Sequence, residues 1–186
     1  MEGWSCKVPP PPPPPGPNLW PLPAKFTNGS THARLSPDFA FGCAGGECGT
    51  VLKSAFARYT GLIWAEKDTV PASRIPQLSG LTVAVNSSDD SLSALQFGVN
   101  ESYTLHVNST SAVITAETAW GAMWGLESFF QLVMREPPEA CSRCTTAPCR
   151  ATCGKYIVRE HVPLSIVDRP RTRWRGLMID VSAAVL

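Results

Sequence analysis

A change of hydrophobic period between residues 103 and 134 constrains the fold most strongly. Residues 103–107 and 112–116 alternate apolar and polar side chains, which is the pattern of strands with one buried face. The turn-like sequence Asn-Ser-Thr-Ser between them predicts a hairpin. Residues 120–134 then switch to helical spacing and carry many aromatic side chains. A helix of this kind has to lie on a sheet rather than face water.

Further elements are predicted on both sides of this region. Apolar residues recur at helical spacing from Val51 to Ile63, which predicts an amphipathic helix with Gly61 near its end. Residues 80–85 alternate and predict a strand, and residues 155–182 predict one or two more strands with their connection. The fold class expected from this order is α+β, a two-layer sandwich of a mainly antiparallel sheet with helices on one face.

Composition divides the chain and excludes two classes of partner. The proline run at residues 9–15 predicts a stiff polyproline II rod, so residues 1–17 are interpreted as a Pro-rich linker. Residues 18–160 form the predicted α+β domain, with a Cys-rich insertion at 137–154. The net charge is only +1 and the basic residues are scattered, which argues against nucleic acid. No run reaches the roughly 18 apolar residues that a membrane span requires.

Glycosylation sequons and cysteines indicate an oxidising, secretory-type compartment. The chain has seven cysteines, and Asn-x-Ser/Thr sequons begin at Asn28, Asn86, Asn100 and Asn108. The N-terminal residues lack the basic-then-apolar pattern of a signal peptide. We therefore expect that the true N terminus is missing or incorrectly assigned.

The cysteines leave two kinds of site open. Cys43 and Cys48 flank a glycine-rich turn, which brings them close enough to form a disulfide. Cys6 is the odd cysteine. A cluster with the spacing C-x2-C-x4-C-x3-C is expected to form disulfides, and a zinc site of four thiolates is the alternative. Its members are Cys141, Cys144, Cys149 and Cys153.

The histidines and the glycine-rich helix suggest no chemistry. His106 points toward solvent by alternation, and no partner serine or aspartate can be placed beside His161. We interpret these two histidines and His32 as ordinary surface or hydrogen-bonded residues. The segment from Gly121 to Gly125 lacks the Lys-Ser/Thr of a phosphate loop. We interpret these glycines as small residues that let the helix approach the sheet.

Arg175 is the strongest candidate for a binding residue. Its guanidinium offers five donors in a planar fork, which suits carboxylates, phosphates or the vicinal hydroxyls of a sugar. A salt bridge at the end of a strand is the alternative, and spacing alone favours it. Residues 176–180 continue from Arg175 as a predicted buried strand.

Residues 161–182 resemble the segment that joins the two domains of family 20 glycoside hydrolases, the β-N-acetylhexosaminidases. The family pattern is P-x-x-I-x-D-x-P-R-F-x-x-R-G-L-x-x-D-x-S, with Thr172 here in place of the Phe. The matching residues are Pro163, Ile166, Asp168, Pro170, Arg171, Arg175, Gly176, Leu177, Asp180 and Ser182. The stretches 19–23, 55–64, 98–107 and 114–133 also resemble parts of that family's N-terminal domain.

The resemblance implies a retaining, substrate-assisted β-N-acetylhexosaminidase that removes terminal non-reducing N-acetylglucosamine or N-acetylgalactosamine. Residues 161–186 would be the linker and the first strand of an incomplete catalytic (β/α)8 barrel. Arg175 would be the substrate-binding arginine, with no cofactor and no metal. The full-length enzyme would act on glycans in a lysosome, a vacuole or outside the cell, and a homodimer is compatible with the family.

Departures from the family pattern point to a truncated fragment. The family's catalytic Asp-Glu pair lies downstream of the first barrel strand, and this sequence ends at Leu186. Asp89 and Asp90 lie in a predicted polar loop and are no substitute. The residues after Ser182 also differ from the family, which suggests a truncated or mis-spliced gene. A non-catalytic interaction module and a zinc-binding module therefore remain as alternatives.

Overall fold

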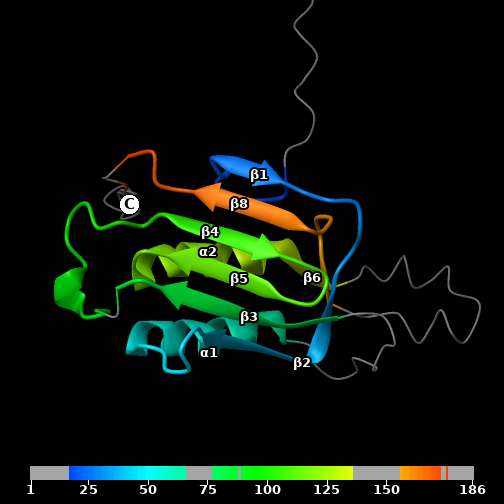
Figure 1. The fold of residues 1–186 in the computed structure, drawn as a ribbon, viewed down its shortest axis with the longest axis horizontal. Coiled ribbons are helices and arrows are strands. Elements are labelled where there is room, and N and C mark those ends of the chain that lie inside the picture. The colour runs from blue at the N-terminus through cyan, green and yellow to red at the C-terminus, as the bar shows by residue number, and fades with distance from the viewer. Residues whose placement is uncertain (1–16, 66–76, 88, 136–155, 173–174, 176–186) are drawn as a thin grey trace, which may run out of the picture.

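One eight-stranded sheet organises the described part of the chain (Figure 1). The computed structural model describes residues 17–65, 77–87, 89–135, 156–172 and 175. The strand order in the sheet is β1-β8-β4-β5-β3-β2-β7-β6. The strands are β1 Lys25–Thr27, β2 Arg34–Cys43, β3 Gln77–Val85, β4 Tyr103–Val107, β5 Ala112–Ala116, β6 Val133–Arg135, β7 Tyr156–Val158 and β8 Leu164–Asp168.

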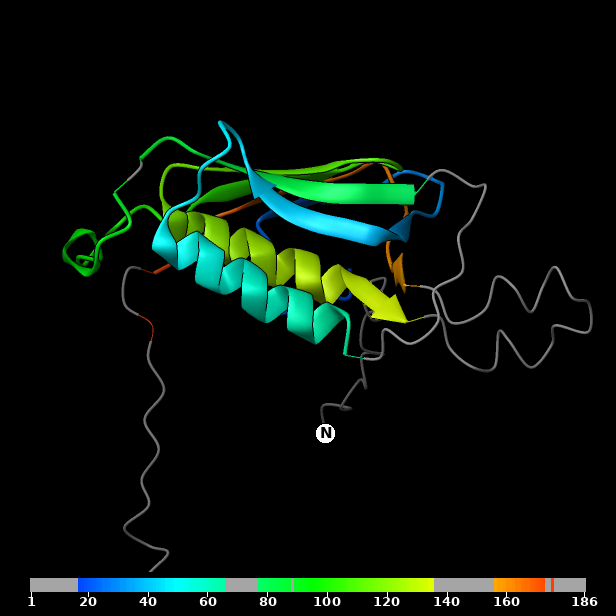
Figure 2. The ribbon, with the colours of Figure 1, turned by 90° about the horizontal axis from the view of Figure 1, so that it is seen from below.

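Two helices cover the same face of this sheet, as Figure 2 shows. They are α1, Thr50–Ile63, and α2, Ala119–Leu132, and a short 3-10 helix, η2, spans Leu92–Ala94. The helices contact each other, and α2 lies against β3, β4 and β5. The predicted α+β class with helices on one face is confirmed. The predicted first barrel strand, residues 176–182, lies outside the described residues.

The sheet is mixed. Strand β3 runs parallel to both β2 and β5. The other neighbouring pairs are antiparallel, including the predicted hairpin of β4 and β5. The parallel strands β2 and β3 are joined by a crossover through α1, and the chain passes from β3 to its other parallel neighbour, β5, through η2 and β4. Two antiparallel strands can be joined by a short turn, but two parallel ones cannot.

Helix α2 sits unusually close to the sheet because it carries glycines on its buried face. A Cβ atom on Gly121 would lie 2.5 Å from the carbonyl oxygen of Ser102, and one on Gly125 would lie 2.9 Å from Cγ2 of Ile114. Leu126 and Phe129 on the same helix are fully buried. The predicted packing role of the two glycines is thus confirmed, and α2 places the core under β4 and β5.

Three details differ from the sequence-based expectations. Helix α2 ends at Leu132 rather than Met134, because Val133 leaves the helix to pair with Val158 of β7. Helix α1 continues through Gly61 to Ile63, so this glycine does not end it. Strand β2 was not predicted, since its alternation is interrupted where the register shifts between Leu35 and Ala40.

The first and last described strands lie side by side. Residues 164–168, expected in the linker, form β8, which pairs antiparallel with both β1 and β4. Ile166 is fully buried there. Residues from both ends of the described chain therefore complete one sheet, and the segment that continues from Asp168 leaves from the end of β8, one strand in from the edge.

The structure bears on only part of the predicted cysteine chemistry. Cys43 and Cys48 form the expected disulfide. Cys6 and the cluster at residues 141–153 lie outside the described residues. Within the described ranges, no group of His, Cys, Asp or Glu side chains is arranged to hold a metal ion. None of the described helices is long and apolar enough to cross a membrane.

Candidate functional site

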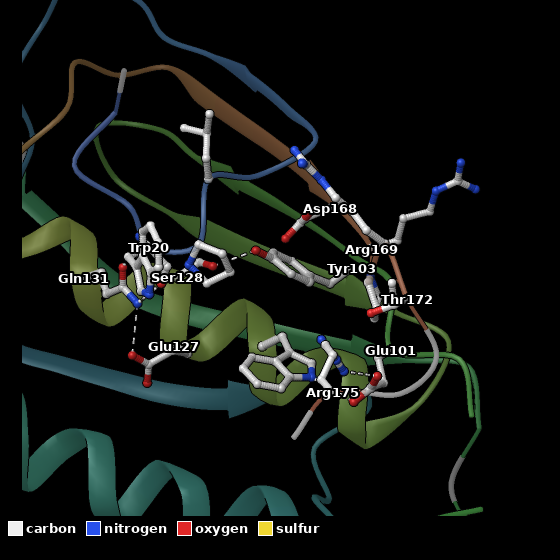
Figure 3. A pocket seen from close by; sticks show the side chains of 15 residues that line it. Trp20, Glu101, Tyr103, Glu127, Ser128, Gln131, Asp168, Arg169, Thr172 and Arg175 are labelled. Carbon is white, nitrogen blue, oxygen red and sulfur yellow. Dashed lines mark hydrogen bonds and ion pairs between the residues drawn. The ribbon is translucent and has the colours of Figure 1, made fainter. Parts of the chain in front are cut away.

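A cavity of about 550 Å³ opens where the N-terminal segment, α2 and the segment after β8 meet (Figure 3). Its wall combines carboxylates, arginines and aromatic rings from positions far apart in the sequence. Trp20 is 83% exposed and Trp124 is 40% exposed. A second, shallower depression adjoins it and shares Glu101 and Arg175.

Arg175 is held at this cavity by two residues of the α+β domain. Its Nη2 donates to Oε2 of Glu101, and its guanidinium carbon lies 5.0 Å from the ring centroid of Trp124. Nε1 of Trp124 donates to the other oxygen of Glu101, Oε1, at 3.0 Å. One carboxylate therefore binds both members of a cation–π pair. Figure 3 shows Arg175 beside Glu101.

A second group of hydrogen bonds fastens the N-terminal segment to the helices. The side-chain amide of Gln131 accepts from the backbone N–H of Trp20 and donates to its carbonyl oxygen, both at 2.7 Å. Nε2 of Gln131 also donates to Glu127 at 3.1 Å. The other oxygen of Glu127 accepts from the Tyr59 hydroxyl at 2.8 Å. This chain of contacts connects α1, α2 and the segment before β1.

Tyr103 forms the floor of the cavity between α2 and β8. Its hydroxyl lies 2.6 Å from the hydroxyl of Ser128, and Figure 3 shows Asp168 close by. Burial raises the pKa of Tyr103 to about 12, and the negative charge of Asp168 adds to the rise. Asp168 itself accepts from the backbone N–H of Ala24 at 3.0 Å. Tyr103 is therefore a neutral hydrogen-bonding group at physiological pH.

The carboxylates of the cavity serve as structural acceptors. Glu101 binds Arg175 and Trp124, Glu127 binds Tyr59 and Gln131, and Asp168 binds Ala24. A pair of carboxylates that cleaves a glycoside has to keep one acid free to protonate the leaving group. The described residues of this cavity can hold elements together and offer apolar contact, but they do not form such a pair.

Other predicted candidates lie elsewhere. His106 is exposed, as alternation predicted. His32 and His161 lie beside each other, with ring centroids 4.4 Å apart, a contact that the sequence did not reveal. The sequon asparagines, all exposed, are Asn28, Asn86, Asn100 and Asn108.

Sequence reasoning missed most of the residues that build the cavity. Glu127 and Gln131 are four residues apart on α2, and this spacing is a signal that could have placed both side chains on one face of the helix. Glu101 gave no such indication, because its partner Arg175 is 74 residues away. Arg175 forms a salt bridge with Glu101. The strand predicted to follow Arg175 lies outside the described residues.

Comparison with known proteins places the chain in a family. The profile described as "beta-acetyl hexosaminidase like" matches residues 19–132, which is more than half of the chain. The chain belongs to this family of glycoside hydrolases. The match includes the N-terminal segment at Trp20, strand β4 and helix α2, so it covers three walls of the cavity.

Two curated relatives match most of the chain. Beta-hexosaminidase subunit B2 of Dictyostelium discoideum is 33% identical over 168 residues, which is 89% of this chain and 26% of the relative. Beta-hexosaminidase subunit beta of Homo sapiens is 30% identical over 190 residues, which is 96% of this chain and 30% of the relative. The chain thus spans between a quarter and a third of the length of these relatives.

Solved structures share the fold at lower sequence identity. The Flavobacterium johnsoniae chitobiase superposes with a TM-score of 0.63 at 21% identity, covering 89% of this chain and 22% of that chain. The Streptomyces plicatus beta-hexosaminidase gives a TM-score of 0.55 at 22% identity, covering 89% and 28%. The fold is therefore one that occurs as a part of larger family 20 enzymes.

Proposed function

We propose that this chain is the N-terminal domain of a β-N-acetylhexosaminidase, together with the lead into its catalytic barrel. The whole enzyme would remove terminal non-reducing N-acetylglucosamine or N-acetylgalactosamine from glycoconjugates. The observation that carries the proposal is the family match over residues 19–132, which covers strands β1 to β5 and both α-helices. The names of the curated relatives, all beta-hexosaminidases, support the substrate class.

The domain itself would take no chemical step. Its cavity carboxylates are occupied by structural hydrogen bonds, and the 186 residues contain no Asp-Glu dipeptide of the kind the family uses. The catalytic acid would be supplied by the barrel. The purified 186-residue chain is therefore expected to hydrolyse no aryl N-acetylglucosaminide, and clear turnover by it would contradict this assignment.

The substrate-binding role of Arg175 is proposed on the family resemblance alone. The guanidinium lies on Glu101 and over Trp124, so a sugar hydroxyl could bind it only if this contact opened or through its remaining donors. The competing role is purely structural, namely a link between the domain and the segment that follows β8. The two roles predict different kinetics.

A domain graft tests the proposed function. Residues 17–175 would replace the matching segment of the Dictyostelium subunit B2, in front of that protein's own remaining chain. We expect the secreted graft to hydrolyse 4-methylumbelliferyl N-acetylglucosaminide within about tenfold of the parent, while the parent without any N-terminal domain is inactive or insoluble. A folded, secreted graft without activity would contradict the proposal.

Two substitutions in the graft separate the roles of Arg175. If the side chain binds sugar, Arg175→Ala lowers kcat/KM about tenfold or more per folded molecule, since each charged hydrogen bond contributes roughly 1.5 to 3 kcal/mol. Glu117→Gln, at an exposed carboxylate outside the cavity, is the matched control and would leave kcat/KM unchanged. If Arg175 is structural, Arg175→Ala lowers stability and does not change kcat/KM per folded molecule.

The cellular compartment and the oligomeric state of the whole enzyme are also proposals. Passage through the secretory pathway is supported by the sequons and by the disulfide between Cys43 and Cys48. A lysosomal, vacuolar or extracellular destination, and a homodimer of the whole enzyme, would follow from the family. Cell fractionation and light scattering of the complete enzyme would test them.

A further inference from the structure

Two of the four sequons lie close together at one end of the sheet. Asn28 directly follows Thr27, the last residue of β1, and Asn108 directly follows Val107, the last residue of β4. Thr27 and His106 are both register partners of Ser165 on β8, which lies between those strands. Two strand spacings correspond to about 10 Å. The two asparagines are therefore neighbours at the same end of the sheet.

The loops that carry Asn28 and Asn108 are held by backbone hydrogen bonds and by the side chains of other residues, Thr31 and Ser79. The N–H of Gly29 donates to the carbonyl of His161 at 3.3 Å, and the N–H of Asn108 donates to the carbonyl of Ser111 at 2.8 Å. Residues 27–32 and 108–111 are all exposed. Neither asparagine side chain makes a hydrogen bond to any described residue. Their amides are thus available for modification without loss of a native contact.

The other two sequons use their amides within the fold. Nδ2 of Asn86 donates to Oε2 of Glu117 at 2.9 Å. Oδ1 of Asn100 accepts from the backbone N–H of Ser102 at 3.0 Å and from its hydroxyl at 2.6 Å. Asn86 follows β3 and Asn100 precedes β4, so both lie at the opposite end of the sheet from Asn28 and Asn108 (Figure 1).

The cavity is also at that opposite end. Asn100 is adjacent in sequence to Glu101, which holds Arg175, and it lines the shallower depression. A glycan there would stand beside the segment that continues beyond β8. A glycan on Asn28 or Asn108 would be separated from this segment by the length of the strands. The space that a glycan needs and the hydrogen bonds of the asparagine side chains thus favour the same two glycosylation sites, Asn28 and Asn108.

We infer that Asn28 and Asn108 carry N-linked glycans that stand side by side at the end of the sheet remote from the cavity. In the transfer, Nδ2 of each asparagine bonds to C1 of the first N-acetylglucosamine of a lipid-linked oligosaccharide diphosphate. The bond from C1 to the diphosphate oxygen breaks, the diphosphate leaves, and Nδ2 gives up one proton. The inference requires the secretory passage of the proposed function but no glycosidase activity.

The glycan is transferred before the chain folds. The folded structure therefore determines which of the transferred glycans the chain tolerates. Asn28 and Asn108 tolerate a glycan because their loops keep every backbone contact. A glycan on Asn86 replaces one of the two amide hydrogens and restricts the rotamer that reaches Glu117. Paired glycans would also cover the end of the sheet near His106, which keeps a partner protein away from that end.

Site occupancy in the secreted chain is the first test. The full 186-residue chain, behind a cleavable signal peptide, is expressed in eukaryotic secretory cells. Peptide N-glycosidase F in heavy-oxygen water then marks each formerly glycosylated asparagine as labelled aspartate, which mass spectrometry locates. We expect label at Asn28 and Asn108 in most secreted molecules. Unmodified asparagine at either position in most molecules would overturn the inference, whether or not the proposed glycosidase function holds.

Four single-sequon chains provide the matched comparison. Each keeps one asparagine and carries Asn→Gln at the other three, with the all-Gln chain as reference. The chains that keep Asn28 or Asn108 should be glycosylated and secreted at the level of the reference, while the chain that keeps Asn86 should be secreted at least twofold less when glycosylated. Equal secretion of the Asn86 chain, or retention of the Asn28 or Asn108 chain, would contradict the inference.

Two single substitutions, which change less of the chain, test the inference if the all-Gln chain fails to fold. Ser30→Ala and Thr110→Ala each remove one sequon and leave the asparagine in place. Each variant should migrate with the mass of one glycan less than the parent and should remain secreted. An unchanged mass in either variant would show that the corresponding asparagine carries no glycan, and would overturn the inference for that site.

Discussion

At the scale of single residues, Glu101 shows how one acceptor can organise a site. Its two oxygens bind different donors, Nε1 of Trp124 and Nη2 of Arg175, and these donors also contact each other through the ring face. The side chain of Arg175 is 41% exposed and that of Glu101 is 20% exposed. Solvent therefore screens the pair, and we expect it to define geometry more than to supply free energy.

Substitution of Glu101 should show how much free energy this ion pair contributes to stability. Glu101→Gln keeps the shape and one acceptor oxygen but removes the charge, so we expect the free energy of unfolding to fall by only about 0.5 to 1 kcal/mol. Urea denaturation would measure the change, and 1 M salt should reduce it because the pair is screened. The matched control is Glu117→Gln, an exposed carboxylate bonded to Asn86. A loss above about 3 kcal/mol would show that the pair is buried.

Tyr103 predicts a loss of stability at alkaline pH. Its folded pKa is about 12, raised by burial, whereas an unfolded tyrosine titrates near 10. The neutral form is favoured in the folded state, so this stabilisation is complete below about pH 10 and is lost as pH rises through about 12. The loss should be on the order of 2 kcal/mol. Urea unfolding at several pH values would show a steeper decline for the parent than for Tyr103→Phe, and parallel curves would contradict the assignment.

At the scale of elements, the approach of α2 to the sheet depends on two missing side chains. Gly121 faces backbone of the loop before β4, whereas Gly125 faces the side chains of Ile114 and Tyr103. The Thr118 hydroxyl caps the helix by accepting from the N–H of Gly121 at 3.2 Å. The first turn of α2 is therefore fixed by its N-terminal cap and by the close contact between Gly121 and backbone atoms of the loop before β4.

Alanine substitution at Gly121 should be costly for this reason. A Cβ atom there would lie 2.5 Å from the Ser102 carbonyl oxygen, so the helix would have to move, and we expect a loss of about 1 to 3 kcal/mol. Gly61→Ala on α1 is the matched control, since nothing lies within 4 Å of its Cβ position. That variant should gain about 0.5 to 1 kcal/mol from helix propensity. Thermal unfolding of both variants would check the prediction, and equal effects would refute it.

At the scale of the whole molecule, local patterns predicted the elements but not what connects them. The hairpin of residues 103–116 and the helix at 50–63 follow from periodicity, because each buries one regular face. Strand β2 escaped detection because Pro37 and Asp38 interrupt its pattern at a register shift. The cavity depends on pairings over 74 and 111 residues, which no local pattern encodes.

The hydrogen bonds between the N-terminal segment and α2 offer a test of these long-range pairings. Gln131 holds both the N–H and the carbonyl of Trp20, although Trp20 is largely exposed. Gln131→Ala removes both bonds, so we expect the segment at residues 19–24 to open locally and the free energy of unfolding to fall by about 1 to 2 kcal/mol. Hydrogen exchange should accelerate at the Trp20 and Ala24 amides and stay unchanged in β4 and β5. Gln96→Ala, in an exposed loop, is the control. Uniform acceleration across the sheet would mean instead that Gln131 supports the core as a whole.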